Sequence, residues 1–358
     1  MKYQTSVRIA DREIALNLPT YFVADIGANH DGDLGRAKEL IWLAKESGAD
    51  CAKFQHFLAK NIVSDRGFRS LGGQYSHQAT WKKPVYEIYK DYECPRDWSE
   101  VLHNTCKEAG IHFLTAPYDI AAIDNFEKWI PAYKVGSGDV TWLQSISRMA
   151  AKGKPVLLAT GAADMADVER AVDAVISTNP QIVLMHCNTN YTGNLENFRY
   201  VNLRVLQAYA LHWPGMVLGL SDHTPGHAAV LGAIALGARV IEKHFTDDDT
   251  REGPDHPFSL TPAGWKEMVD RSREVEFALG DGVKRVEGNE MQTVVLQRRA
   301  IRYARDMPVG SVLHADDLEV LRPCPAEGLP PYRMNELFGS VLTTAVERGD
   351  CVKWNDLT

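Results

Sequence analysis

The sequence predicts an α/β fold: a TIM barrel of eight parallel strands alternating with helices, followed by a small β-rich domain. From Tyr21 onward apolar runs alternate with helical patterns, and eight such runs fit strands. Eight β/α units over roughly 260 residues also suit a TIM barrel in length. A doubly wound open sheet is the competing architecture, but no GxGxxG motif follows the first strand to support a dinucleotide site.

The eight predicted strands are short apolar runs whose C-terminal ends turn polar. They cover residues 22–25, 52–55, 112–115, 132–135, 156–160, 182–186, 217–220 and 239–243. At several junctions a glycine ends the helix just before the next strand, as in ESGADCAKFQ and LGARVIEKHF. The first predicted helix, GDLGRAKELIWLAKES, is amphipathic. Its apolar face holds Leu34, Ala37, Leu40, Ile41 and Ala44.

Three segments lie outside this repeat. SVRIA and REIALNL predict a small N-terminal hairpin, and residues 57–92, rich in aromatic residues and lysines, predict a loop over the mouth of the barrel. The polar, aperiodic stretch after residue 280 predicts an interdomain linker. We therefore expect a catalytic barrel at 1–280, a linker at 281–297 and a β-rich domain at 298–358.

Composition limits the class of protein. The 358 residues carry a net charge of −8, which argues against nucleic acid or an anionic membrane as partner. No N-terminal run resembles a signal peptide, no apolar stretch could span a bilayer, and the six cysteines form no CxxC pair. We expect a reduced cytoplasmic protein, and we interpret Cys187, beside His186, as a buried structural thiol rather than a nucleophile.

Two histidines follow neighbouring strands in matching positions. His223 comes just after the run 217–220, and His244 just after the run 239–243. A right-handed crossover through GHAAVLGAIALG would bring both strand ends to the same edge of the sheet. Two neutral imidazoles there suit an open divalent-metal site. In the alternative interpretation each histidine only bonds a backbone group at a strand end.

Two lysines also stand at strand ends. Lys53 and Lys134 would be costly in apolar strands unless they are paired or used, and either could bind a phosphate or carboxylate. The alternative is a salt bridge to Asp25 or Glu242. The glycines of VGSGD leave backbone N–H groups beside Ser137, and Ser221 adds a hydroxyl, so the barrel mouth could bind an anion.

The chain resembles the sialic acid synthase family, which condenses phosphoenolpyruvate with an N-acetylated amino sugar. The resemblance rests on ADIGANHDGD (24–33), AKFQ (52–55), AYKVGSGD (132–139), LLATG (157–161), GLSDHT (219–224), EKHFT (242–246) and GPDH (253–256). The segment 298–323 resembles the family's C-terminal antifreeze-like (SAF) domain. The resemblance implies a homodimer with a swapped C-terminal domain, phosphoenolpyruvate and an amino sugar as substrates, and a nonulosonic acid and phosphate as products.

The resemblance also implies roles for individual residues. Asp25, His223 and His244 are the expected catalytic residues, the two histidines being the metal ligands. The expected substrate-binding residues are Lys53, Gln55, Thr115, Lys134, Ser137, Tyr191, Ser221, Asp255 and Arg322, with Arg322 recognising the sugar's N-acyl group across the dimer. The sequence departs from the family at Asp25, usually glutamate, at Ala159, usually serine, and at Thr189, asparagine in several members.

The expected metal is manganese, with cobalt or magnesium as alternatives, acting as a Lewis acid on the aldehyde of the open-chain sugar. The sugar is N-acetylmannosamine or a related 6-deoxy-diacetamido sugar. Two rival functions remain. A metal-dependent hydrolase on the same barrel would usually show an HxH motif after the first strand, where only His30 stands. A non-catalytic carbohydrate-binding protein would leave the paired lysines and histidines unexplained.

Overall fold

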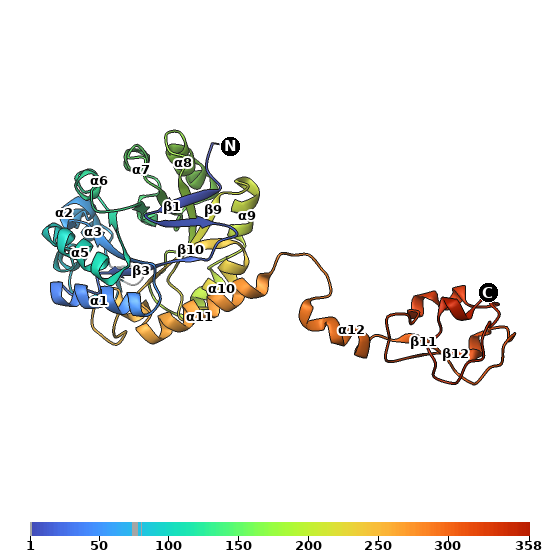
Figure 1. Ribbon diagram of the computed structural model, residues 1–358. Helices are drawn as coiled ribbons and strands as arrows, with labels where there is room; N and C mark the ends of the chain where they lie inside the picture. The colour runs from blue at the N-terminus through green and yellow to red at the C-terminus, as the bar shows by residue number, and fades with distance from the viewer. Residues whose placement is uncertain (1, 74–77, 80) are drawn as a thin grey trace. The chain divides into compact units, whose positions relative to one another are not determined.

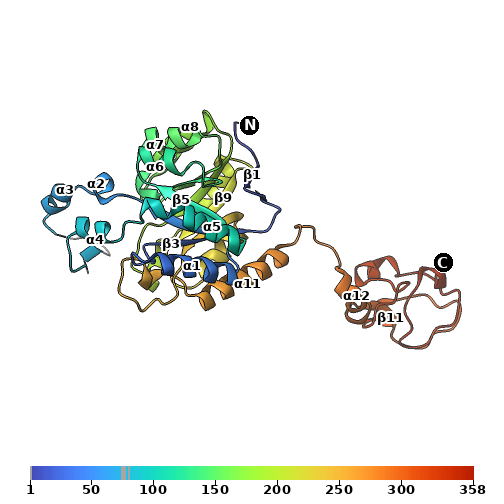
Figure 2. The same cartoon turned by 60° about the vertical axis from the view of Figure 1, so that its left-hand side comes forward.

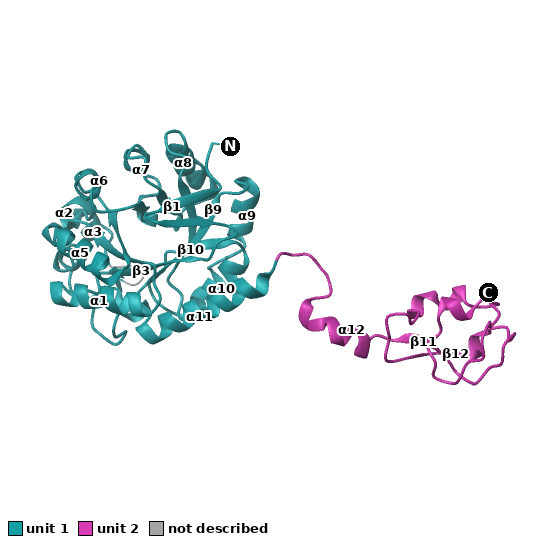
Figure 3. Ribbon diagram, viewed as in Figure 1, with its two compact units in different colours: residues 1–280 teal, residues 281–358 magenta. Residues whose placement is uncertain are grey.

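A computed structural model describes residues 2–73, 78–79 and 81–358. It divides into two compact units, residues 1–280 and residues 281–358 (Figure 3). The units are described separately below. Among the described residues, no helix is both long enough and apolar enough to cross a membrane.

The first unit is built around one sheet of eight parallel strands (Figure 1). The strands are β3 (Tyr21–Gly27), β4 (Cys51–His56), β5 (His112–Pro117), β6 (Tyr133–Val135), β7 (Val156–Ala159), β8 (Ile182–Cys187), β9 (Val217–Asp222) and β10 (Ala238–His244). Their order is β5-β4-β3-β10-β9-β8-β7-β6, and β5 and β6 lie side by side, so the sheet is a nearly closed barrel. The predicted TIM barrel is confirmed.

Helices cover the outside of the barrel. They are α1 (Leu34–Glu46), α5 (Ser99–Ala109), α6 (Ile120–Phe126), α7 (Leu143–Ala150), α8 (Met165–Ile176), α9 (Val205–His212), α10 (Ala228–Ala235) and α11 (Pro262–Leu279). Strands covered on both faces must be apolar on both, and every residue of β9 and β10 up to the polar strand ends is buried. The helix α1 buries the predicted face, and its Asp33 cap accepts a hydrogen bond from the Arg36 backbone.

An N-terminal hairpin closes the end of the barrel where the strands begin. Its strands are β1 (Ser6–Ile9) and β2 (Arg12–Ala15), and the sheet pairing confirms the predicted hairpin. Asp11 lies in the turn between β1 and β2. Its carboxylate is 2.7 Å from Nε2 of His112, the first residue of β5. The hairpin therefore covers the N-terminal end of the barrel, and the C-terminal ends of the strands form its open face.

The described part of the segment 57–92, which excludes residues 74–77 and 80, contains three short α-helices: α2 (Ala59–Ile62), α3 (Asp65–Ser70) and α4 (Val85–Asp91). Figure 2 shows them gathered on one side of the barrel. The predicted location is right, but the segment is more helical than the expected loop. Asp119, the cap of α6, holds α2 by accepting a hydrogen bond from Asn61 (2.9 Å), and Lys82 bonds Glu252 in the loop after β10 (2.7 Å).

The second unit has its own small core. Strands β11 (Ala300–Tyr303) and β12 (Leu318–Leu321) pair antiparallel. A cluster of buried apolar side chains packs around them, including Ile301, Tyr303, Leu313, Leu337 and Val352. The helix α12 (Met291–Gln297) occupies part of the stretch expected to be a linker, and none of its side chains is buried.

Candidate active site

A cavity of about 450 Å³ opens where the barrel strands end. Ten of the twelve site residues that the sequence singled out line it, namely Asp25, Lys53, Gln55, Lys134, Ser137, Tyr191, Ser221, His223, His244 and Asp255. They come from the ends of different strands or the loops that follow, as expected for a site on this fold.

Strand register explains why these side chains meet. His244 of β10 pairs with Asp25 of β3, which in turn pairs with Lys53 of β4. Glu242 of β10 pairs with Ser221 of β9. Because alternate residues of a strand point the same way, residues in register on neighbouring parallel strands lie side by side, here facing the cavity.

Asp25 is the most tightly held acidic group of the cavity. It lies 2.7 Å from Nζ of Lys53 and accepts a hydrogen bond of 2.9 Å from Gln55. Burial raises the pKa of this carboxyl, but the charges of Lys53 and His244 outweigh burial and bring the pKa to about 2. Asp25 is thus ionised at neutral pH, within reach of a ligand.

The second buried lysine is paired in the same way. Lys134 donates to Oε1 of Glu242 at 2.9 Å, and Nζ of Lys53 lies 3.6 Å from the same oxygen. The other oxygen of Glu242 is buried with no hydrogen-bond partner in the described structure. The salt-bridge interpretation of the lysines is therefore confirmed. Both side chains also line the cavity, and anion binding by them stays a prediction.

The two histidines lie next to each other, with ring centroids 5.5 Å apart. Nδ1 of His223 is 3.2 Å from the carbonyl oxygen of Asn188. A carbonyl only accepts, so this bond places the proton on Nδ1 and leaves the lone pair on Nε2, the form that binds a metal. Nδ1 of His244 is buried without a hydrogen bond, 3.7 Å from Asp255.

These donors fit an open metal site of two imidazoles, with other positions left to water or substrate. The described residues contain no group of three or more metal-binding side chains. Four carboxyl groups, Asp25, Asp139, Glu242 and Asp255, line the cavity against two lysines. This excess of negative charge favours a divalent cation there.

A glycine allows Asp255 to reach the histidines. Gly27 has φ +52°, and a Cβ atom on it would lie 2.5 Å from Oδ2 of Asp255. The space left by that missing atom lets Asp255 accept a hydrogen bond of 2.9 Å from the backbone of Ala28. A larger residue at 27 would push Asp255 out of the site.

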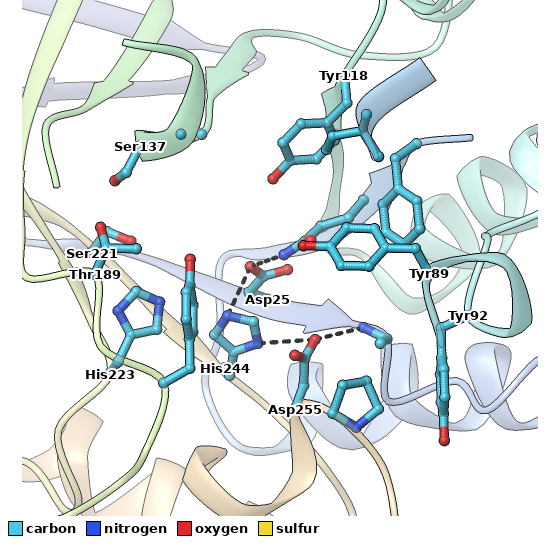
Figure 4. A pocket seen from close by; sticks show the side chains of 18 of the residues that line it. Asp25, Tyr89, Tyr92, Tyr118, Ser137, Thr189, Ser221, His223, His244 and Asp255 are labelled. Atoms are coloured by element: carbon cyan, nitrogen blue, oxygen red, sulfur yellow. Dashed lines mark hydrogen bonds and ion pairs between the residues drawn. The ribbon is translucent and has the colours of Figure 1, made fainter. Parts of the chain in front are cut away.

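Hydroxyl groups and glycines line one end of the cavity, where Figure 4 shows Ser137, Ser221 and Thr189. Ser137 Oγ accepts a hydrogen bond of 3.0 Å from the backbone of Gly161, and a Cβ atom on Gly161 would lie 1.8 Å from Thr189 Oγ1. Only glycine fits there. Ala159, one of the departures, is buried in β7 and does not line the cavity.

Aromatic side chains form the opposite side. Figure 4 shows Tyr89 and Tyr92 across the cavity from Ser137 and Ser221, with Asp25 and His244 between them and His223 next to Ser221. Tyr118 also lines the cavity, as do Phe57 and Trp81 of the insertion. The sequence had not singled out any of these five. Tyr118, three residues beyond a predicted strand end, could have been found from its position, whereas the insertion offers no periodic pattern.

Two expected site residues, Thr115 and Arg322, are not among the residues of the barrel that line the cavity. Thr115 pairs with Phe54 of β4, one residue out of step with Lys53 and Gln55, so it faces the helices. Its hydroxyl donates to the Phe54 carbonyl (3.0 Å) and lies 2.7 Å from Nδ1 of His56. Arg322 lies in the second unit, where its Nε donates to the carbonyl of Gln297.

The fold and the cavity define a TIM-barrel protein with paired lysines, hydroxyls and adjacent imidazoles at the strand ends. The chain belongs to the NeuB family, whose model matches residues 40–284, and it carries an SAF domain at 298–358. The family and the SAF domain expected from the sequence are confirmed.

Named relatives are similar over almost the whole chain. The N,N'-diacetyllegionaminic acid synthase of Legionella pneumophila is 33% identical, covering 95% of each chain. The human N-acetylneuraminate-9-phosphate synthase is 33% identical over 93% of this chain and 91% of its own. The crystal structure of sialic acid synthetase from Leptospira borgpetersenii is 25% identical, with a TM-score of 0.70 over 81% of this chain and 95% of its own. These relatives support a synthase of sialic-type acids.

Proposed function

We propose that the protein condenses phosphoenolpyruvate with the aldehyde of an open-chain N-acetylated amino sugar, giving a nonulosonic acid and phosphate. One observation carries the proposal. A single cavity holds two lysines, a row of hydroxyls at one end, two adjacent imidazoles, and aromatic side chains on the side opposite the hydroxyls. Neither a hydrolase nor a carbohydrate-binding module would need this combination of groups in one cavity.

The hydroxyl end suits phosphoenolpyruvate, which carries a phosphate and a carboxylate. Lys53 and Lys134 supply charge, while Ser137 and Ser221 supply hydroxyl donors beside the glycines of VGSGD. The lysines already share Oε1 of Glu242. A bound anion would therefore compete with Glu242 for their ammonium groups.

The reaction forms a bond between carbon 3 of phosphoenolpyruvate and the aldehyde carbon of the sugar. The aldehyde oxygen takes up a proton and becomes a hydroxyl. Water adds to the positive charge left on carbon 2, and the tetrahedral intermediate loses phosphate with cleavage of its C–O bond. Asp25, which is ionised and lies between His244 and Lys53, would accept a proton from that water.

His223 and His244 would hold a divalent cation, with manganese as the expected ion and cobalt or magnesium as alternatives. When bound, this cation would supply a Lewis acid for the sugar aldehyde. The Asn188 carbonyl fixes the His223 tautomer, and Asp255 stands beside His244 Nδ1. These neighbours would orient both rings towards one ion.

Gln55, Tyr191 and Asp255 would contact the sugar, since all three line the cavity. Arg322 would complete the sugar site from the partner chain of a homodimer whose C-terminal domains are exchanged. That arrangement is proposed from the family resemblance alone.

The test is release of inorganic phosphate with purified protein, manganese, phosphoenolpyruvate and a panel of N-acetylated amino sugars. Release should require both substrates. Phosphoenolpyruvate labelled with ¹⁸O in its bridging oxygen should give labelled phosphate, because the C–O bond breaks. A carbohydrate-binding protein would release none, and a hydrolase would act without phosphoenolpyruvate.

The metal proposal has its own test. Replacing either metal-site histidine, as His223→Ala or His244→Ala, should abolish turnover and manganese binding with little loss of thermal stability, because both lie at the open face of the barrel. The His227→Ala variant, at a partly buried position that does not line the cavity, serves as control. Full turnover in metal-stripped protein would exclude the metal.

A further inference from the structure

The side of the cavity away from the hydroxyls has a chemical character that selects among sugars. It is formed largely by the insertion 57–92, which contributes Phe57, Ile62, Trp81, Ile88, Tyr89 and Tyr92. The rings of Phe57 and Tyr89 lie 5.2 Å apart, and those of Trp81 and Tyr89 lie 6.4 Å apart. These six residues, which line the cavity together, are called here the aromatic wall.

The position of the wall determines which part of the sugar meets it. In the proposed reaction the aldehyde carbon lies at the histidines, next to carbon 3 of phosphoenolpyruvate. The sugar chain must then extend away from the hydroxyl end. Figure 4 places Tyr89 and Tyr92 on that far side, with Asp25 and His244 in between and His223 on the side of Ser221. Carbon 6, the end of the chain, would therefore lie against the aromatic wall.

The wall itself offers no cation for a phosphate group at carbon 6, and the partner chain's Arg322, proposed above as part of the sugar site, is assigned to the N-acyl group. Among the described residues that line the cavity, the only lysines or arginines are Lys53 and Lys134, and both pair with carboxylates. The acidic groups Asp139 and Asp255 line the same cavity. Burying a doubly charged phosphate there, beside carboxylates and without a cation, would be strongly unfavourable.

Two lysines stand outside the wall, in an adjoining surface groove. Lys82 bonds Glu252 and Lys83 bonds Asp91, and the four side chains of these pairs are about half exposed or more. Exposed pairs of this kind bind anions weakly because water screens them. They do not line the main cavity.

The wall does suit methyl groups and neutral amides. Aromatic faces and the side chains of Ile62 and Ile88 can pack against methyl groups. Burial raises the pKa of Tyr89 and Tyr118, so both hydroxyls stay protonated at neutral pH. Neither hydroxyl bonds another group within the described part of the chain. The Tyr118 hydroxyl lies against Gly136, whereas that of Tyr89, on the aromatic wall, is available to an acetamido group.

Building on the proposed function, we infer that the sugar substrate carries no phosphate and ends in a methyl group at carbon 6, as in a 6-deoxy sugar with two acetamido groups. The aromatic wall holds the carbon 6 methyl, and the Tyr89 hydroxyl binds the second acetamido group. The insertion thus sets the specificity of the site.

The test compares kcat/KM for three sugars under saturating phosphoenolpyruvate: a 2,4-diacetamido-2,4,6-trideoxy sugar, N-acetylmannosamine, and N-acetylmannosamine 6-phosphate. We expect the first to exceed the second by about tenfold or more, since a buried methyl and an amide hydrogen bond are lost together. The 6-phosphate should be the poorest. Equal or better use of either N-acetylmannosamine compound would overturn the inference while leaving the synthase function intact. No phosphate release with any sugar would instead refute the function itself.

A charge added to the wall gives the converse test. Ile88→Arg should raise kcat/KM for the 6-phosphate sugar by about tenfold and lower it for the deoxy sugar, because it adds a partner for phosphate. Ile88→Leu is the matched control of similar size and should change neither. Lys82→Ala should also change neither. A large loss for the 6-phosphate sugar in Lys82→Ala would place the phosphate in the outer groove and overturn the inference.

Discussion

At the scale of single residues, the site depends on ion pairs that a ligand must rearrange. Lys53 and Lys134 are buried with Asp25 and Glu242, and a buried pair is balanced between desolvation and attraction. Phosphoenolpyruvate would offer these lysines a further partner. We expect its binding to be sensitive to each lysine, and sugar binding less so.

The Lys134→Met variant should raise KM for phosphoenolpyruvate by roughly ten- to a hundredfold, the cost of one charge-assisted hydrogen bond. KM for the sugar should change much less. Steady-state phosphate release with each substrate varied in turn measures both.

Lys134→Met also leaves Glu242 with only the more distant Lys53 as an ion-pair partner. The free energy of unfolding of this variant should therefore be lower than that of the wild type. The double variant Lys134→Met/Glu242→Gln removes both charges and should regain stability without regaining affinity for phosphoenolpyruvate. Lys82→Met, at an exposed pair, is the control. If KM for phosphoenolpyruvate stays at the wild-type value in the folded double variant, Lys134 is structural only.

The buried carboxyl of Asp139 makes the stability of the fold depend on pH. Burial raises the pKa of its carboxyl from 3.8 to about 6. Between these values the folded state binds a proton that the unfolded state does not, so the free energy of unfolding falls as pH rises from about 4 to about 6. Asp139→Asn should therefore be more stable than wild type at pH 7.5, by up to about 3 kcal/mol, and similar near pH 4.

Urea unfolding at both pH values checks this prediction. The exposed Asp249→Asn variant should show no such pH-dependent gain. A constant difference between Asp139→Asn and wild type across the range would mean that the Asp139 carboxyl titrates normally.

At the scale of elements, the strands were predictable and the insertion was not. Eight apolar runs with polar ends predicted the barrel. Because its strands are parallel, their C-terminal ends lie together at one end of the barrel. Thr115 shows the limit of this reasoning. It stands at a strand end, but strand parity turns it towards His56 and away from the cavity. Which face of the strand Thr115 occupies could not be assigned from the sequence without knowing the register of β5 against β4.

The aromatic wall escaped prediction for another physical reason. The helices α2, α3 and α4 are four to seven residues long, too short for a hydrophobic period to appear. Their position depends on tertiary contacts, such as the bond from Asn61 to Asp119. Composition alone indicated where the insertion lies.

Asp119 links this insertion to the barrel and should be needed to position it. One carboxylate oxygen caps α6 through the backbone of Ala122 (2.8 Å), and the other accepts from Asn61 (2.9 Å) and from Arg96. Asp119→Ala should cost about 1 kcal/mol for the lost cap and raise KM for the sugar. Hydrogen exchange should speed up in α2.

Asn61→Ala separates the two roles of Asp119. It removes the contact to the insertion and leaves the cap of α6 intact, so it should raise KM for the sugar with a smaller loss of stability. If Asp119→Ala lowers stability but neither variant changes hydrogen exchange in α2 or KM for the sugar, the insertion is held by other contacts.

At the scale of the whole molecule, two units divide the expected site residues. The barrel holds all of them except Arg322, which belongs to the unit 281–358. In a symmetric dimer with exchanged C-terminal domains, each site would combine the barrel of one chain with the Arg322 of the other. Neither chain alone would then be active.

Two inactive variants can test this arrangement. His244→Ala damages the barrel part of the site, and Arg322→Ala damages the part contributed by the second unit. In a mixed dimer, the barrel of the Arg322→Ala chain meets the intact Arg322 of the His244→Ala chain, giving one complete site. After subunit exchange at equal amounts, activity should return to about one quarter of the wild-type value, since half the dimers would carry one intact site of two. Native mass spectrometry with differently tagged chains verifies the exchange. Proven mixed dimers that remain inactive would show that Arg322 acts on its own barrel or lies outside the site.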